Sequence, residues 1–178
     1  METKRLKCGE FSSRYSVRLL VPDDGETILK LCRTNPLYYA CCGTEVTVEE
    51  ILRDMTLLPP GVSKENKYYC GYFHENRLLA VLDLIDRYPD AQTAYIGFFM
   101  VDGTASGQGR GSAIMAELAD FLRCHDIGRL RLAYDEKNPQ AVRFWKKQGF
   151  VPLRLVEHEY GLLTLAEKTI SGLDSANR

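Results

Sequence analysis

Four glycines stand close together before an amphipathic run in the stretch GFFMVDGTASGQGRGSAIMAELADFL, which covers residues 97–122. The first turn of a helix has backbone N–H groups without intrahelical partners, and this end of the helix dipole is partly positive. Glycines in front of that turn let a ligand approach the backbone closely and let φ become positive. A strand, a glycine loop and a helix in this order therefore predict a cradle for an anion. The four are Gly103, Gly107, Gly109 and Gly111.

The spacing of these glycines narrows the choice of anion. A Walker loop needs G-x-x-x-x-G-K-[ST], and none of these glycines is followed directly by a Lys-Ser or Lys-Thr pair. A dinucleotide fingerprint needs G-x-G-x-x-G, but its last position holds Ser112 when the frame starts at Gly107 and Ile114 when it starts at Gly109. A nucleotide-binding enzyme stays open as an alternative, since another diphosphate could use the same cradle.

Two short motifs, about 30 residues apart, fit one known family. Gln108, Gly111 and Ala113 form Q-x-x-G-x-A, which resembles the acyl-CoA pyrophosphate loop of the GNAT acetyltransferases, Q/R-x-x-G-x-G/A. The segment NPQAVRFWKKQGF, residues 138–150, resembles that family's second motif, N-x-x-A-x-x-F-Y-x-x-x-G-F. The resemblance covers roughly residues 95–151, and Trp145 replaces the usual Tyr. The matching positions of the second motif are Asn138, Ala141, Phe144, Gly149 and Phe150.

The resemblance implies a single GNAT-like α/β (α+β) domain whose fourth and fifth strands splay apart and receive acetyl-CoA between them. The pantetheine arm would follow the backbone of the fourth strand at Phe99, Met100 and Val101. Asn138 and Phe144 would contact that arm, and Trp145 would form a wall of the channel. The pyrophosphate would rest on the loop formed by Gln108, Gly109, Arg110, Gly111, Ser112 and Ala113.

The implied reaction is direct transfer of the acetyl group to a primary amine of a small molecule or peptide. A backbone N–H of Met100 or Val101 would stabilise the oxyanion. Asp83 and Asp86, near the end of a predicted hairpin, are candidates for the base that removes the proton of the amine, with surface charge as the alternative. The acid that protonates the thiolate would be Tyr134 or a water.

The Tyr-to-Trp replacement leaves a second hypothesis open. The family's Tyr often serves as an acid, whereas the indole N–H of Trp145 donates a hydrogen bond without surrendering its proton. The chain could therefore be a non-catalytic acyl-CoA-binding or regulatory domain. Glu157 and His158 are weaker catalytic candidates. The wall of the acceptor site is expected at Tyr38, Tyr39, Cys41 and Cys42.

Hydrophobic periodicity predicts a mixed α/β chain of about seven strands and about four helices, and the resemblance implies that the strands form one mixed central sheet. The run NPLYYACCGTE, residues 35–45, is expected to be irregular, and HENR, residues 74–77, to form a four-residue hairpin turn. Helices are predicted over residues 22–35, 47–58, 139–148 and the run after the glycines, with an apolar face at Ile114, Leu118, Phe121 and Leu122. Strands are predicted over residues 15–21, 67–73, 77–85, 93–101, 128–134, 150–158 and 160–170.

Composition limits the remaining possibilities. The 178 residues suit one domain, 1–178, with residues 1–14 as an N-terminal extension and 171–178 as a frayed tail. A net charge of −1 gives no case for a nucleic-acid partner, and no apolar run approaches the roughly 20 residues of a membrane span. Six cysteines without a C-x-x-C pair argue against a metal site and for a reducing, cytoplasmic location. The resemblance also implies that the protein forms a homodimer through its last strands.

Overall fold

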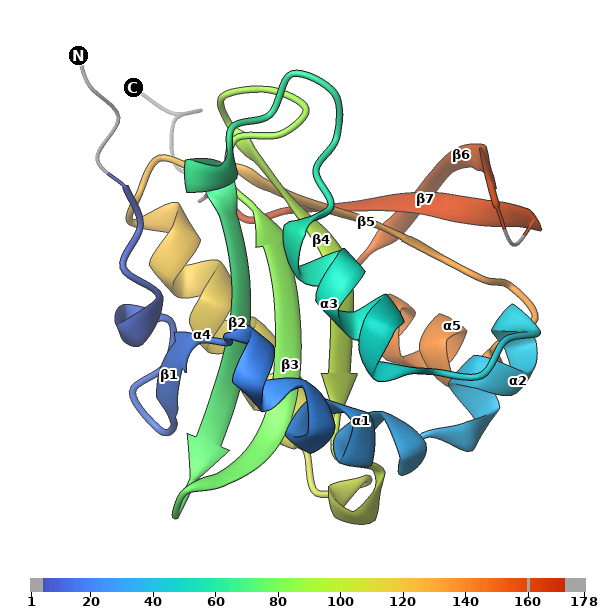
Figure 1. Cartoon of the computed structure of the whole chain (residues 1–178). Helices are drawn as coiled ribbons and strands as arrows, with labels where there is room; N and C mark the ends of the chain where they lie inside the picture. The colour runs from blue at the N-terminus through green and yellow to red at the C-terminus, as the bar shows by residue number, and fades with distance from the viewer. Residues whose placement is uncertain (1–4, 160, 172–178) are drawn as a thin grey trace, which may run out of the picture.

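A seven-stranded mixed sheet in the order β1-β2-β3-β4-β5-β7-β6 forms the centre of the molecule (Figure 1). This computed structural model describes residues 5–159 and 161–171. Neighbouring strands run antiparallel except for β4 and β5, which are parallel. The strands are β1 Ser16–Leu19, β2 Lys67–His74, β3 Arg77–Ile85, β4 Thr93–Val101, β5 Arg129–Tyr134, β6 Val151–His158 and β7 Gly161–Thr169.

Helices cover both faces of the sheet, with α1 and α3 on one face and α4 on the other (Figure 1). Short 3-10 turns, η1 Cys8–Glu10, η2 Pro22–Asp24, η3 Lys64–Asn66 and η4 Gly103–Ala105, connect several elements. The sequence prediction of a mixed, seven-stranded α/β fold is confirmed. In the part of the chain that the structure describes there are five α-helices: α1 Gly25–Arg33, α2 Pro36–Cys42, α3 Val48–Thr56, α4 Arg110–Arg123 and α5 Pro139–Lys147.

Each face of the sheet has its own apolar core. On the α4 side, Ile114, Leu118 and Leu122 are fully buried, while Phe121 packs against this core half-buried. These positions lie at helical spacing on one face, which explains why α4 is amphipathic. On the other side, the core includes Ile28 of α1, Ile51 of α3 and Met100 of β4.

The prediction that residues 35–45 are irregular is wrong, because Pro36–Cys42 form α2. Proline suits the first position of a helix, since its fixed φ is already helical and its missing N–H is not needed there. Gly43 ends the helix with φ of +68°. The start and stop signals were therefore present, but the short aromatic run between them showed no periodicity.

The hairpin between β2 and β3 is also tighter than predicted. β2 extends to His74 and β3 begins at Arg77, so the turn has two residues rather than four. Glu75 and Asn76 occupy it with φ of +48° and +63°. Two successive positive φ values match the twist of the flanking strands.

β4 carries an irregularity where it separates from β5. Asp83 pairs with Phe98 and Leu84 pairs with Ile96, so Gly97 is an extra residue in β4. Pairing between β4 and β5 runs only from Thr93↔Arg129 to Ile96↔Leu132. Beyond Ile96 the two strands therefore diverge.

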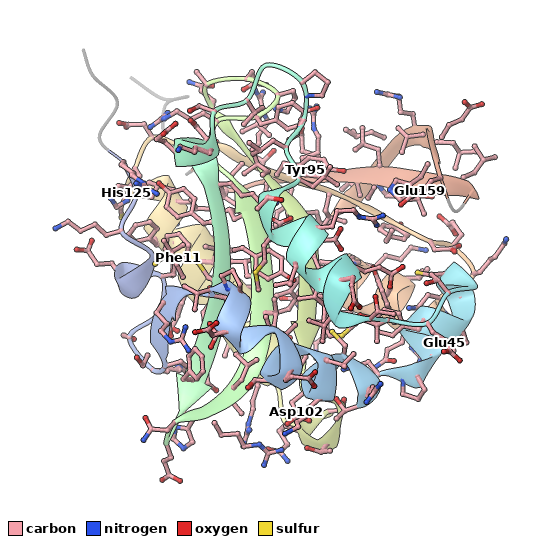
Figure 2. The ribbon with its side chains drawn as sticks, viewed as in Figure 1. Phe11, Glu45, Tyr95, Asp102, His125 and Glu159 are labelled. Carbon is pink, nitrogen blue, oxygen red and sulfur yellow. The ribbon has the colours of Figure 1, made fainter. Side chains whose placement is uncertain are left out.

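The described part of the predicted extension, residues 5–14, packs onto the domain. Leu6 and Phe11 are buried. The Phe11 ring, marked in Figure 2, lies 5.8 Å from Tyr68 and 5.0 Å from Phe121 between ring centroids. Of the predicted tail, residues 172–178 lie outside the described residues.

Candidate functional site

The loop before α4 depends on glycine for its backbone conformation. Gly107 and Gly109 have φ of +78° and +72°, and a side chain at either position would meet no heavy atom within 4 Å. Conformation rather than space therefore requires glycine at both positions. Gly109 is also the residue that precedes the first turn of α4.

The first turn of α4 offers backbone N–H groups that the described part of the chain leaves without acceptors. Ala113 N–H donates to Gly109 O at 3.0 Å. No hydrogen bond to another described residue uses the N–H groups of Arg110, Gly111 or Ser112. Arg110 also forms no ion pair with a described residue, so its guanidinium can face an anion. The arrangement fits a phosphate group.

Gly111 marks a close approach between α4, α5 and β4. A β-carbon at this position would lie 3.1 Å from the Phe144 ring and 3.4 Å from Val101 Cγ2. Ser112 ties the same helix end to α5, because Gln148 Nε2 donates to its Oγ at 2.8 Å. The cradle therefore lies against the end of β4 and is tied to α5.

The backbone of β4 presents unused polar groups on its β5 side. Asp102 N–H donates to Leu79 O at 2.8 Å, and hydrogen-bonded pairs alternate along an antiparallel ladder. Met100 therefore directs its N–H and C=O toward β3, whereas Phe99 and Val101 direct theirs toward the gap beside β5. One of them is engaged: Val101 O accepts from Asn35 Nδ2 at 3.0 Å.

Aromatic rings line the α5 side of this gap. Phe99 lies 6.0 Å from both Phe144 and Trp145 between ring centroids. Trp145 is buried, and its ring also lies 5.2 Å from Phe150. Trp145 is thus part of the core as well as a neighbour of Phe99, while Phe144 is only half-buried.

Asn138 caps α5 and is buried. Its Oδ1 accepts hydrogen bonds from the N–H groups of Gln140 and Ala141, both at 3.1 Å. Its Nδ2 donates to no described residue, so the donor half of the amide stays available. The side chain can hold α5 and still bind a carbonyl.

Asp83 lies on the α3 side of the sheet at the point where β4 bulges. Its carboxylate is nearly buried, and Lys67 Nζ donates to Oδ2 at 2.9 Å. Oδ1 is also buried and has no partner in the described residues. Burial raises the pKa of Asp83 to about 6, although Lys67 opposes the rise. This value suits a group that takes up a proton near neutral pH.

The other carboxylate candidate occupies a different environment. Asp86 is buried at the end of β3, 3.8 Å from Arg87 Nε, and Arg87 in turn donates to His125 O. This places Asp86 near the C-terminal end of α4. Glu157 and His158 are exposed on β6.

Tyr134 lies on β5 beyond the last residue that pairs with β4. The side chain is buried, and its hydroxyl has no partner among the described residues. Burial raises the pKa of Tyr134, so the phenol keeps its proton at neutral pH. It is a potential proton donor on the β5 side of the gap.

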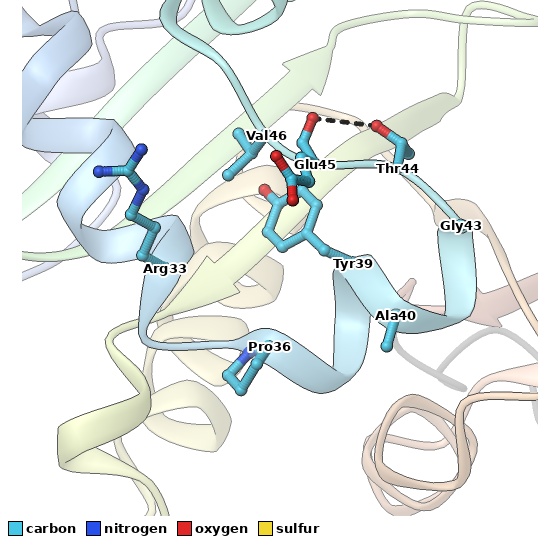
Figure 3. A pocket seen from close by; sticks show the side chains of 8 residues that line it. All are labelled: Arg33, Pro36, Tyr39, Ala40, Gly43, Thr44, Glu45 and Val46. Carbon is cyan, nitrogen blue, oxygen red and sulfur yellow. Dashed lines mark hydrogen bonds between the residues drawn. The ribbon is translucent and has the colours of Figure 1, made fainter.

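α2 forms a wall next to β4, as its aromatic contacts show. The Tyr38 ring packs 5.8 Å from Phe98, and Cys41 Sγ lies 3.5 Å from Lys137 O. An open pocket of about 610 Å³ lies between the end of α1, α2 and the loop that follows it (Figure 3). Its lining residues are Arg33, Pro36, Tyr39, Ala40, Gly43, Thr44, Glu45 and Val46.

Sequence reasoning missed three residues of this site: Lys67, Asn35 and Gly97. Lys67 begins a strand of buried residues, and a lysine in such a strand indicates a buried ion pair. Asn35 and Gly97 gave no signal before the pairing of β4 was known. In the described residues no group of three or more His, Cys, Asp or Glu could hold a metal ion. No described helix is both long and apolar enough to span a bilayer.

Comparison with known families identifies the family of the chain. The model of the Acetyltransferase (GNAT) family matches residues 34–150, which is more than half of the chain.

The chain belongs to the GNAT acetyltransferase family.

Solved GNAT structures share the fold. An acetyltransferase from Thermus thermophilus is 23% identical, with a TM-score of 0.70 over 87% of this chain and 96% of that one. The PaiA N-acetyltransferase from Thermoplasma acidophilum, solved in complex with coenzyme A, is 19% identical, with a TM-score of 0.62 over 87% and 98%. No curated protein sequence matches the chain. Membership of the family makes this GNAT protein an acetyl-CoA-dependent acyltransferase by class.

Proposed function

We propose that this GNAT protein transfers the acetyl group of acetyl-CoA directly to a primary amine of a small molecule or peptide. One observation carries the proposal: the free N–H groups at the start of α4 lie next to the end of β4, where β4 and β5 diverge. A diphosphate bound to those N–H groups would let the pantetheine arm attached to it enter the gap between β4 and β5. Family membership supports acetyl-CoA as the donor.

The cofactor would be held mainly by backbone. Residues 108–113 would bind the pyrophosphate, with Arg110 adding a positive charge. The pantetheine amides would bind the outward-facing C=O of Phe99 and N–H of Val101, since Val101 O already accepts from Asn35. Asn138 Nδ2 would donate to a carbonyl of the arm, and the half-buried Phe144 would pack against it.

Asp83 is the proposed general base. It takes one proton from the substrate ammonium on Oδ1, directly or through one water, and leaves a neutral amine. The amine nitrogen then forms a bond to the acetyl carbon, and an N–H of β4 stabilises the oxyanion. The ladder geometry disfavours Met100 for this donor, because its N–H is directed to β3, and Val101 lies against Gly111 at the cradle; the outward-facing N–H of Phe99 is the one nearer to Asp83.

Tyr134 is the proposed acid. When the carbon–sulfur bond breaks, the sulfur needs the second proton that the nitrogen releases. The phenol of Tyr134 can donate a proton to the thiolate and regain one from that nitrogen through water. Trp145 would serve as a wall, because its indole keeps its proton.

The acceptor would approach from the α2 and α3 side, where Tyr38, Phe98 and Asp83 are found. The neighbours show how varied GNAT acceptors are. One resembling chain is a spermidine N-acetyltransferase chimera from Vibrio cholerae and hSSAT, and another is the ribosomal-protein-S18-alanine N-acetyltransferase from Escherichia coli. They support an amine acceptor without selecting between a small molecule and a peptide.

A homodimer is proposed through β6, the edge strand of the sheet. Val151, Leu153 and Leu155 are exposed there by 50–63% of their surface, and Leu162 of β7 by 59%. An exposed apolar edge strand favours association. The free cysteines support a reducing, cytoplasmic location.

A panel of primary amines tests the proposed function. Purified protein and acetyl-CoA are combined with aromatic monoamines, polyamines and peptides with free N-termini, and thiol release is followed. At least one acceptor class should release coenzyme A faster than the reaction without amine. Tight acetyl-CoA binding with no thiol release on any amine would instead support the non-catalytic acyl-CoA-binding domain.

A further inference from the structure

We propose that Lys67 is a positioning residue that holds Asp83 by one carboxylate oxygen and leaves the other, Oδ1, as the proton acceptor. The inference rests on the proposed function, in which Asp83 is the base. It concerns a residue outside both family motifs.

The contacts of Lys67 fix its ammonium in one place. The side chain is buried, with 7% of its surface exposed. Nζ donates to Leu57 O at 2.8 Å and to Asp83 Oδ2 at 2.9 Å. The Tyr69 ring lies 5.9 Å from Nζ. A buried lysine with these fixed partners can hold a carboxylate in one orientation.

The strand register explains why these two side chains meet. Asp83 is directly opposite Tyr69, so Lys67, two residues earlier on β2, is its diagonal neighbour on the same face. Both side chains point toward the α3 side, where Leu57 follows the helix. Lysine is long enough to span both partners.

The two carboxylate oxygens are therefore unequal. Oδ2 accepts from Lys67, while Oδ1 is buried without a partner in the described residues. Asp86 Oδ1 is likewise buried without a described partner, so what distinguishes Asp83 is its place beside Gly97, where β4 and β5 separate. Oδ1 is the atom free to accept the proton of the amine.

Among the charged groups that face Asp83, Lys67 is the one that lowers the pKa of its carboxyl. Lys67 and Tyr69 face it from β2, and Asp54 faces it from α3. Burial and Asp54 both raise the pKa of Asp83, and Lys67 lowers it. Without Lys67 the carboxyl would stay protonated at neutral pH and could not act as a base.

The test is a ¹³C NMR titration of the Asp83 carboxyl in protein labelled at the aspartate side chain, with Asp83→Asn used to identify the signal. Wild type should titrate near pH 6. Lys67→Met should titrate at least about one pH unit higher, and Lys67→Arg should stay close to wild type, because it keeps the charge. A Lys67→Met titration that coincides with wild type would overturn the inference.

Kinetics on the best amine of the panel provide the second readout. In Lys67→Met the pH at which kcat/KM falls on the acidic side should rise by the same amount as the midpoint of the NMR titration. The KM for acetyl-CoA should stay unchanged. An equal loss of kcat at every pH would indicate a merely structural role and contradict the proposal.

The double variant Lys67→Met/Asp83→Asn covers the case in which Lys67→Met does not fold, because it removes both buried charges. It should be no slower than Asp83→Asn alone, since Lys67 acts only through Asp83. A further tenfold loss would overturn the inference. If Asp83→Asn keeps full turnover while acetyl-CoA binds, the proposed base is wrong and this inference falls with it. If only the Lys67 variants behave unexpectedly, the proposed function stands.

Discussion

Asp83 lies directly beside Gly97: a methyl group at position 97 would stand 2.8 Å from Asp83 Oδ2. The carboxylate thus fills the space that a side chain on β4 would take. Gly97 is also the extra residue of the β4 bulge, next to the last pair between β4 and β5. This relationship brings a buried acid to the point where the two strands separate.

Gly97→Ala should slow turnover about tenfold or more without changing the affinity for acetyl-CoA. The added methyl group must displace Asp83, and Lys67 prevents the carboxylate from moving freely. Steady-state kinetics and calorimetric binding measure the two effects separately. An unchanged kcat would contradict the close placement of Asp83.

Asp83→Asn should lower kcat by about 10²–10⁴-fold, the range for loss of a general base. Asn keeps the shape of the side chain but cannot take up the proton. Asp86→Asn is the matched control, because Asp86 is also a buried carboxylate of the same hairpin but lies near α4. Equal losses in both variants would argue against a specific role for Asp83.

The pH dependence of kcat/KM should report the ionisation of Asp83. Asp83 works as a base only when ionised, so kcat/KM should fall as the pH drops through about 6. The Asp83→Asn variant should lack this inflection. Rate measurements from about pH 5 to 8 decide the point, and a wild-type profile without a transition near pH 6 would speak against Asp83.

Gly111→Asp should weaken acetyl-CoA binding at least about a hundredfold, because it places a negative charge at the proposed pyrophosphate site. Gly111→Ala should weaken it less, through the contact with Phe144 at 3.1 Å. Calorimetry measures both, and circular dichroism checks that the variants fold. Wild-type affinity in Gly111→Asp would exclude this loop as the binding site.

Tyr134→Phe should lower kcat about tenfold to a hundredfold with unchanged acetyl-CoA affinity, if its phenol protonates the thiolate. Tyr72→Phe is the control, since Tyr72 also has a buried hydroxyl without a described partner but lies on β2. Thiol release with the best amine measures both variants. Full activity of Tyr134→Phe would assign the acid to water.

Most helices and strands could be predicted from the sequence, because the hydrophobic periodicity of each is strong and lies within one continuous segment. The apolar face of α4 and the signals at both ends of α5 could be read residue by residue. α2 was missed because its seven residues bury none of their side chains fully, so no stripe marks it.

The residues of the candidate site also fall into two groups: those that a local motif predicts, and those that only the fold brings together. The glycines before α4 and Asn138 could be proposed from motif spacing, because a single segment contains each group. The meeting of Asp83, Lys67 and Gly97 depends on strand register and on a bulge, which no local pattern of residues encodes. Long-range pairing therefore limits prediction of the catalytic groups.

A crystal structure with acetyl-CoA bound tests the central claim most directly. The account predicts the diphosphate within hydrogen-bond distance of the N–H groups of residues 109–113, and the thioester between β4 and β5 on the side of Asp83. Acetyl-CoA bound elsewhere, such as in the pocket beside α2, or side chains closing the gap between the two strands, would contradict it.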